Sequence, residues 1–293
     1  MQLKEIDYAV KEKIYSFIQQ PFPLWENRLT ELLVQKKWEE LRTYGINKPN
    51  EYSTSRALFS STLTPLPTST VIFNGPKEET INLEAPSFDL LERFYSEHGL
   101  EPLLESEIES TDVLSKLANA LAMLKLVEPA YLGISKLVRS IQVLRQEDAE
   151  IDTSYSHPKI PFSIFVTVCE DDTTLYSLRV AESILHEAMH LKLTLIEEVV
   201  PLVQSRTKNL YYSPWRDEER PIQGVLHGLF VFRAIFNFFE LLKVILNSNE
   251  VIDYLNVRTD QVKEEINQLK DFGLCADLTI DGANLVTNLL PLN

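Results

Sequence analysis

A long apolar segment in the C-terminal third, PIQGVLHGLFVFRAIFNFFELLKVIL at residues 221–246, constrains the fold most strongly. Pro221 suits the start of a helix, and apolar residues then cover almost every direction around the helix axis. Such a helix has no face that tolerates water, so other elements must surround it. We therefore expect a central, buried helix in a mainly helical protein.

The rest of the chain shows further helical patterns and one clear strand. Helical patterns cover residues 3–44 (broken at QQPFPLW), 87–98, 111–146, 178–200 and 254–270, with a short helix in the tail. Ser87 is a candidate N-cap, and Pro129 divides 111–146 into two helices. Residues 159–168, KIPFSIFVTV, predict a strand. Residues 46–85 predict an irregular connection with at most short strands, such as STVIF at 69–73.

The predicted fold class is mainly α (α+β): a helical domain with a small β-sheet next to the helix at 178–200. We expect a single domain over residues 1–293. Its N-terminal part, 1–110, is helical and irregular, its core covers 111–250, and a helical tail follows at 251–293.

Composition and charge argue against several functions. The chain has 28 Lys and Arg against 43 Asp and Glu, a net charge of −15, which disfavours nucleic acid. Glycine-rich phosphate loops are absent from the sequence. Cys169 and Cys275 match no zinc or redox spacing and are expected to be reduced thiols. The charged start, MQLKEIDYAVKEK, and the lack of a long apolar run predict a cytoplasmic protein without membrane contact.

The chemistry is concentrated in the stretch ESILHEAMHLKL at residues 182–193, which contains an HExxH pattern. Four helical residues advance about 400° and rise about 6 Å, so His186 and His190 project from one face and can bind one ion. Glu187 points about 100° away, where a zinc peptidase uses its glutamate to reach metal-bound water. We therefore expect a metal site in the core segment 111–250.

A third protein ligand has to come from elsewhere in the chain. The close-spaced HExxHxxGxxH pattern fails, because positions 193 and 196 are Leu and Ile. Glu197 lies about 10 Å along the helix from His190, too far for the same ion. His227 is the best candidate, because an unpaired imidazole in the apolar setting GVLHGLF is costly. Two antiparallel helices joined by the loop at 205–220 would bring it against His186 and His190.

Other residues remain as weaker ligand candidates. Glu218 and Glu219 are alternatives from the loop, whereas His98 and His157 lie in a helix-end and a loop-like context. Three histidines with open positions suit zinc with a water, but also iron(II) with a bidentate co-substrate. The spacing does not choose between these metals.

The long loop before the apolar helix adds arginines and aromatics. It contains YYSPWRDEERP at residues 211–221. A guanidinium here could pair with the distal carboxylate of 2-oxoglutarate, or only with the acidic residues beside it. Arg216, Arg220 and Tyr212 are the candidate co-substrate-binding residues. Arg216 is favoured, because Pro214 and Trp215 would hold its backbone rigid.

The order of these segments resembles a known family. A strand IPFSIFVTV, then HEAMH, then YYSPWR and RPIQGVLHGLFVF is similar to the HExxH-motif proteins encoded beside ribosomal peptide natural-product clusters, over roughly residues 110–245. That family resembles iron(II)- and 2-oxoglutarate-dependent peptide β-hydroxylases. The resemblance implies that His186, His190 and His227 hold iron, that an arginine of this segment binds 2-oxoglutarate, and that a precursor peptide is the substrate.

Two other functions stay open at this point. In a zinc metallopeptidase, Glu187 would act as general base for a zinc-bound water. A non-enzymatic helical binding module is the third reading, which the intact ligand set disfavours. The sequence leaves the oligomeric state unknown.

Overall fold

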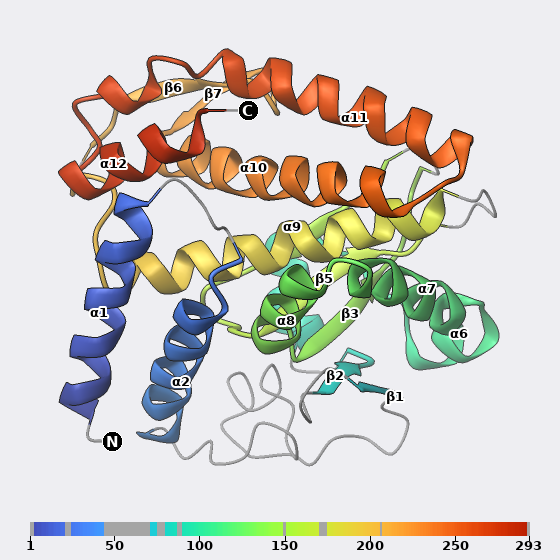
Figure 1. Ribbon diagram of the computed structural model, residues 1–293. Coiled ribbons are helices and arrows are strands. Elements are labelled where there is room, and N and C mark those ends of the chain that lie inside the picture. The colour runs from blue at the N-terminus through green and yellow to red at the C-terminus, as the bar shows by residue number, and fades with distance from the viewer. Residues whose placement is uncertain are drawn as a thin grey trace. The chain divides into compact units, whose positions relative to one another are not determined.

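The computed structural model describes residues 3–20, 25–43, 71–74, 80–86, 90–148, 151–169, 175–205 and 207–291 (Figure 1). The chain forms two compact units, one of residues 1–37 and 192–293 and the other of 38–191. The architecture is mainly helical with some β-structure, as the sequence predicts. Among the described helices, none combines the length and the apolar character needed to cross a bilayer.

The unit of residues 38–191 is built around a five-stranded sheet with the strand order β1-β2-β3-β5-β4. Its strands are β1 (Val71–Asn74), β2 (Thr80–Leu83), β3 (Ser140–Leu144), β4 (Ser154–Ser156) and β5 (Ser163–Thr167). The pairs β2–β3 and β3–β5 are parallel, and the outer pairs β1–β2 and β4–β5 are antiparallel. Every residue of β3 and β5 is buried, as expected for parallel strands covered on both faces.

Helices complete this unit. They are the π-helical turn η2 (Leu91–Tyr95), α5 (Ser96–His98), α6 (Glu105–Ser110), α7 (Val113–Lys125) and α8 (Glu128–Leu137). One face of the sheet packs against η2 through a buried cluster that includes Phe94, Tyr95 and Phe165. Phe94 stacks on Phe165 with ring centroids 5.1 Å apart. The α7–α8 pair confirms the division that Pro129 predicts.

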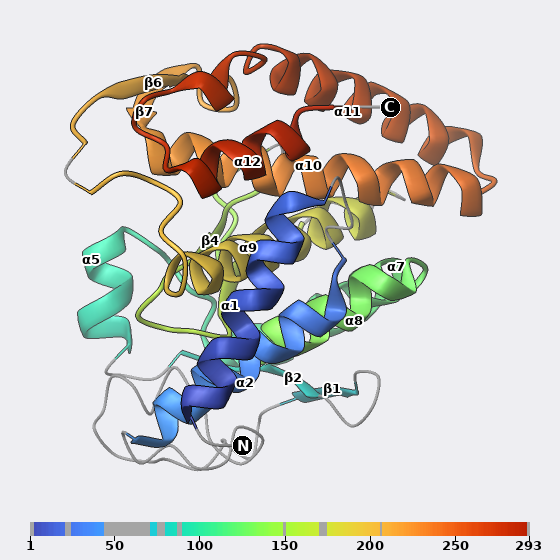
Figure 2. The ribbon, with the colours of Figure 1, turned by 60° about the vertical axis from the view of Figure 1, so that its left-hand side comes forward.

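The unit of residues 1–37 and 192–293 is helical around α10 (Ile222–Ile245). It also contains α1 (Leu3–Gln19), α11 (Asn249–Asn267), η3 (Phe272–Leu274) and α12 (Ile280–Leu289). Figure 2 shows α10 and α11 running side by side, with α12 across the end of α1. Thirteen residues of α10 are buried, including Val225, Phe230 and Phe238, which confirms the predicted central helix.

Two further helices, α2 (Asn27–Thr43) and α9 (Tyr176–Glu197), each contain a boundary between the units. They confirm the helical patterns at 3–44 and 178–200. The prediction of one domain over the whole chain stays a prediction.

Two predictions of local structure are wrong. Residues 140–144 form the buried strand β3, although they were included in the helical pattern 111–146. Residues 205–220 are not simply a loop, because β6 (Leu210–Ser213) and β7 (Glu218–Pro221) pair as an antiparallel hairpin. The Ser87 cap and most of the irregular connection at 46–85 lie outside the described residues.

Candidate metal centre

Helix α9 holds the HExxH residues on a well-packed element. Ile184, Leu185, Ala188 and Met189 are almost completely buried and form the apolar stripe that the sequence predicts. His186 and His190 lie one turn apart beside this stripe and are partly exposed. The helix therefore fixes the Cα positions of both histidines through packing that does not involve their rings.

The two imidazoles converge on one point. The Nε2 atoms of His186 and His190 are 3.1 Å apart, and their ring centroids are 4.7 Å apart. Two nitrogens that each lie about 2.1 Å from one ion at a right angle are about 3.0 Å from each other. The spacing of 3.1 Å is thus close to that of two ligands at a right angle on one ion, and it is also the length of an N–H···N hydrogen bond between the two rings.

Glu187 lies beside this pair and is held by the sheet. Its carboxylate is 3.9 Å from Nε2 of His186, and the residue is only 3% exposed. The hydroxyl of Ser154 on β4 donates to Oε1 over 2.6 Å, and Ser156 donates a second hydrogen bond. Burial raises the pKa of Glu187 to about 7, while both serine hydrogen bonds act in the opposite direction. The group can thus hold or release a proton near neutral pH.

Strand β4 and its serines are functional features that sequence analysis missed. Residues 153–157, TSYSH, alternate small polar and aromatic side chains over too short a run to predict a strand reliably. The small sheet does lie next to the HExxH helix, as predicted, because Ser154 and Ser156 both contact Glu187.

His227 lies in the other unit and bonds to a carboxylate there. Its Nε2 is 3.0 Å from Oε2 of Glu197, and the amide of Gln223 donates to the same oxygen over 2.9 Å. Because a carboxylate accepts at this contact, the His227 Nε2–H is the donor to Glu197. Glu197, which the sequence excluded as a ligand of the His190 ion, is therefore a direct partner of His227.

The predicted set of three histidine ligands is not tested by these contacts. His186 and His190 belong to the unit of residues 38–191, and His227 belongs to the unit that includes 192–293. Within the described parts of the chain, no group of three or more His, Cys, Asp or Glu side chains is close enough to hold one ion. The ligand role of His227 stays a prediction.

The weaker ligand candidates have other surroundings. Glu218 and Glu219 are exposed on β7. His98 Nδ1 is 3.1 Å from the Tyr155 hydroxyl, and the His98 and His157 rings are 5.0 Å apart within the aromatic cluster on the sheet. The pKa of His157 is lowered, mainly because the ring is partly buried and to a smaller extent because His98 lies beside it.

The SPWR segment forms the turn of the β6–β7 hairpin. The Arg216 N–H donates to the Ser213 carbonyl over 3.2 Å, with Pro214 at the second turn position that it favours. Asp217 follows with a positive φ of 51°, a conformation that Asp tolerates better than most residues. The Tyr212 hydroxyl donates to Asp217 over 2.8 Å. The tyrosine is therefore exposed but hydrogen-bonded within the hairpin.

Trp215 anchors the hairpin on α10. Its indole stacks on Phe232 with centroids 5.0 Å apart and planes 8° apart. A Cβ added at Gly228 would lie 2.5 Å from the indole, so only glycine allows this approach. The buried Nε1 of Trp215 has no hydrogen-bond partner among the described residues.

The two arginines occupy different environments. Arg216 is exposed at the turn. The guanidinium of Arg220 lies over Gly224, where an added Cβ would be 3.6 Å away, and its Nε is 3.7 Å from Glu218. Gly224 is one turn before His227 on α10, so the Arg220 guanidinium lies against the helix that carries the predicted ligand.

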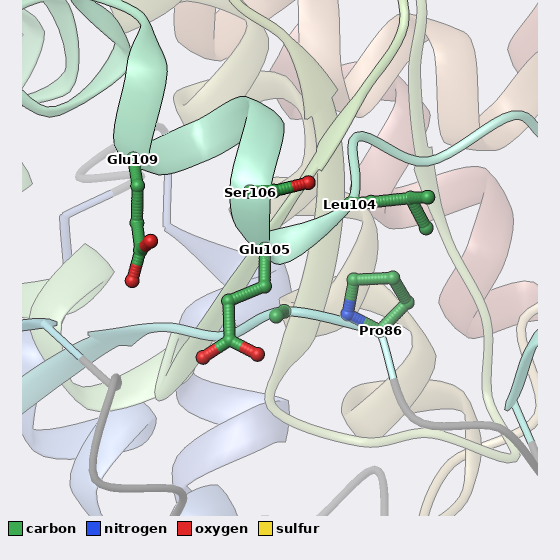
Figure 3. A pocket seen from close by; sticks show the side chains of 6 residues that line it. Pro86, Leu104, Glu105, Ser106 and Glu109 are labelled. Carbon is green, nitrogen blue, oxygen red and sulfur yellow. The ribbon is translucent and has the colours of Figure 1, made fainter.

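Among the described residues of the unit 38–191, two hollows are lined without any predicted site residue. The first, about 480 Å³, is lined by Ala85, Pro86, Leu104, Glu105, Ser106 and Glu109 (Figure 3). The second, about 250 Å³, is lined by residues that include Glu101, Arg145, Glu147, Asp148 and Thr153. The second adjoins β4, because Thr153 directly precedes that strand.

Comparison with known proteins adds no family assignment: no family model matches the chain, and no curated protein matches it.

Proposed function

We propose that the protein is an iron(II)- and 2-oxoglutarate-dependent hydroxylase that acts on a side chain of a ribosomally made precursor peptide. The observation that carries the proposal is the convergence of the His186 and His190 Nε2 atoms to 3.1 Å on a buried helix. The order of HEAMH, SPWR and GVLHGLF, which resembles the HExxH peptide β-hydroxylases, supports the proposal of iron and 2-oxoglutarate over zinc.

The proposed roles divide among a few side chains. His186 and His190 bind the iron, and His227 is the proposed third ligand. Iron with 2-oxoglutarate and oxygen supplies the oxidation of a C–H bond, which no side chain can perform alone. The protein binds and orients the reactants. Glu197 orients the ring of His227 by accepting a hydrogen bond from its Nε2–H, the kind of contact that commonly orients a metal-binding histidine.

An arginine of the hairpin is proposed to bind the distal carboxylate of 2-oxoglutarate. Arg220 is the better supported residue, because Gly224 leaves room for its guanidinium against α10, whereas Arg216 is exposed. Tyr212 is a weaker candidate, since its hydroxyl already donates to Asp217.

Arg220→Lys is expected to weaken 2-oxoglutarate binding by roughly 10–150-fold, because an ammonium cannot form the two parallel hydrogen bonds of a guanidinium, worth about 1.5–3 kcal/mol. Arg216→Lys is the matched control and should titrate like the unchanged protein. The measurement is anaerobic titration of iron-loaded protein, followed by the metal-to-ligand charge-transfer absorbance. If the unchanged protein shows no such band, the co-substrate proposal is wrong. If only Arg216→Lys weakens binding, the two arginines exchange roles.

A zinc metallopeptidase is the second candidate, and the environment of Glu187 favours it. A carboxyl group with a pKa of about 7, 3.9 Å from a proposed ligand nitrogen, has the properties of a general base. A hydroxylase would need no such base, because iron with 2-oxoglutarate and oxygen would supply the oxidation of the C–H bond when bound.

Glu187→Gln separates the two candidates. Glutamine keeps the size of the side chain and accepts from Ser154, so we expect metal binding and measurable hydroxylation to remain. In a zinc metallopeptidase, loss of the general base would instead lower the rate of peptide cleavage by about 10²–10⁴-fold. The measurement is product formation from peptide mixtures by mass spectrometry, with iron or zinc. Metal-dependent cleavage by the unchanged protein that disappears in Glu187→Gln contradicts the hydroxylase.

We further propose a cytoplasmic location. Cys169 and Cys275 are both free thiols, which fits a reducing compartment. No nucleic-acid partner is proposed, because the net charge is −15.

A further inference from the structure

Strand β4 is an edge of the five-stranded sheet. It pairs with β5 on one side only, through Ser154–Val166, Tyr155–Phe165 and Ser156–Ile164. An edge strand presents unpaired N–H and C=O groups to whatever lies beside it. Its open side is therefore a site where an extended chain can add.

The pairing determines which main-chain groups face outward. The Thr167 N–H donates to the Thr153 carbonyl over 2.8 Å. Hydrogen-bonded and non-hydrogen-bonded pairs alternate in an antiparallel ladder, so Tyr155 bonds to β5 and the N–H and C=O groups of Ser154 and Ser156 point away from it. In the described part of the chain, no residue outside the sheet bonds these outward main-chain groups.

The same two serines connect the edge to the candidate metal centre. Their hydroxyls both donate to Glu187, whose carboxylate is 3.9 Å from Nε2 of His186. A chain paired with β4 would lie about 4.8 Å from it, and its alternate side chains would point to the face of the sheet where Glu187 lies. A side chain of the added strand on that face would therefore lie on the same side of the sheet as Glu187, the residue next to His186.

We propose that β4 binds the peptide substrate by strand addition: an extended segment pairs with the outward N–H and C=O groups of Ser154 and Ser156. This inference rests on the proposed function for the statement that the bound peptide is the substrate. Peptide recognition of this kind takes its affinity from main-chain hydrogen bonds and its specificity from alternate side chains.

The hollow next to β4 indicates the charge of the peptide. Its lining contains the carboxylates of Glu101, Glu147 and Asp148 against the single guanidinium of Arg145. Arg145 is itself ion-paired with Glu107 over 2.6 Å. A peptide that extends past Thr153 into this hollow is therefore expected to carry Lys or Arg at that end.

The test uses a randomised, biotinylated octapeptide library and the full-length protein with EDTA, without iron or 2-oxoglutarate. The tightest peptide is then resynthesised with single N-methyl groups at each position in turn. Strand addition predicts that methylation weakens binding about fivefold to tenfold at every second residue and less than about twofold between them, because only alternate N–H groups face β4. The enriched peptides are expected to carry Lys or Arg near one end.

The matched variants are Ser156→Pro and Ser156→Ala. Both lose the hydroxyl, but only proline also loses the outward N–H. Proline is tolerated in an edge strand at a position whose N–H points away from the neighbouring strand. Ser156→Pro is expected to weaken peptide binding about tenfold relative to Ser156→Ala, with circular dichroism as the check on folding. If Ser156→Pro does not fold, the N-methyl series on the unchanged protein decides the question.

The inference is overturned by a library that enriches no binding peptide, or by N-methyl effects without the two-residue alternation. Equal binding by folded Ser156→Pro and Ser156→Ala also overturns it. Since binding is measured without iron and 2-oxoglutarate, these failures leave the charge-transfer titration unaffected. In turn, the absence of a charge-transfer band would not change the peptide-binding result. The experiments therefore distinguish failure of the hydroxylase proposal from failure of the strand-addition proposal.

Discussion

His186→Ala and His190→Ala are each expected to abolish stoichiometric iron binding while most of the helical circular dichroism remains. In the unchanged protein the two Nε2 atoms lie 3.1 Å apart and can chelate one ion together. Each variant keeps only one of these two nitrogens. The packing of α9 depends on its buried apolar stripe, which neither histidine belongs to. His227→Ala is expected to lose the metal as well. The measurement is metal analysis after anaerobic loading and dialysis.

The control for these variants is His98→Ala, a histidine that bonds Tyr155 and lies outside the predicted ligand set. It should bind iron like the unchanged protein. Full occupancy and activity in His227→Ala would place the third ligand elsewhere, at Glu218 or Glu219. Full occupancy in His186→Ala or His190→Ala would contradict the metal site itself.

The sequence predicted the helical elements because their signals are local and long. The apolar run at 221–246 has no polar face, so burial follows from the residues alone, and α10 is buried as expected. The HExxH spacing likewise predicts two imidazoles on one helix face, and their Nε2 atoms lie 3.1 Å apart. Both predictions depend only on helical geometry within one element.

The features that were missed depend on contacts between distant segments. Residues 140–144, SIQVL, are a buried strand because β2 and β5 pair with them, whereas their composition fits the preceding helical pattern. The partners of Glu187 come from β4, more than thirty residues earlier in the chain. Glu197 was excluded by its distance from His190 along α9, and only the fold shows that it bonds His227.

The hairpin at 210–221 shows how an element can be present in the sequence and still be overlooked. Ser213 and Pro214 are typical of a β-turn, but the strands on either side are only four residues long, too short for a clear alternating pattern. The structure gives Trp215 a packing role against Gly228 and Phe232. This contact is one of those that attach the segment carrying both arginines to α10.

Gly228→Val is therefore expected to lower the free energy of unfolding by about 2–4 kcal/mol, because even a Cβ at this position would lie 2.5 Å from the Trp215 indole and displace it from Phe232. The measurement is urea unfolding. Gly224→Ala is the control on the same helix. Its Cβ would meet only the Arg220 guanidinium, at 3.6 Å, and alanine favours a helix over glycine by about 1 kcal/mol, so it should be neutral or stabilising.

A double-mutant cycle then tests whether the loss comes from the indole. Gly228→Val in a Trp215→Ala background should cost much less than in the unchanged protein, because the clashing ring is absent. An equal cost in both backgrounds would show that valine disturbs α10 itself and that Trp215 does not anchor the hairpin. If the anchor is correct, Gly228→Val should also raise the 2-oxoglutarate concentration needed for the charge-transfer band, since the displaced hairpin carries Arg220 away from its position over Gly224.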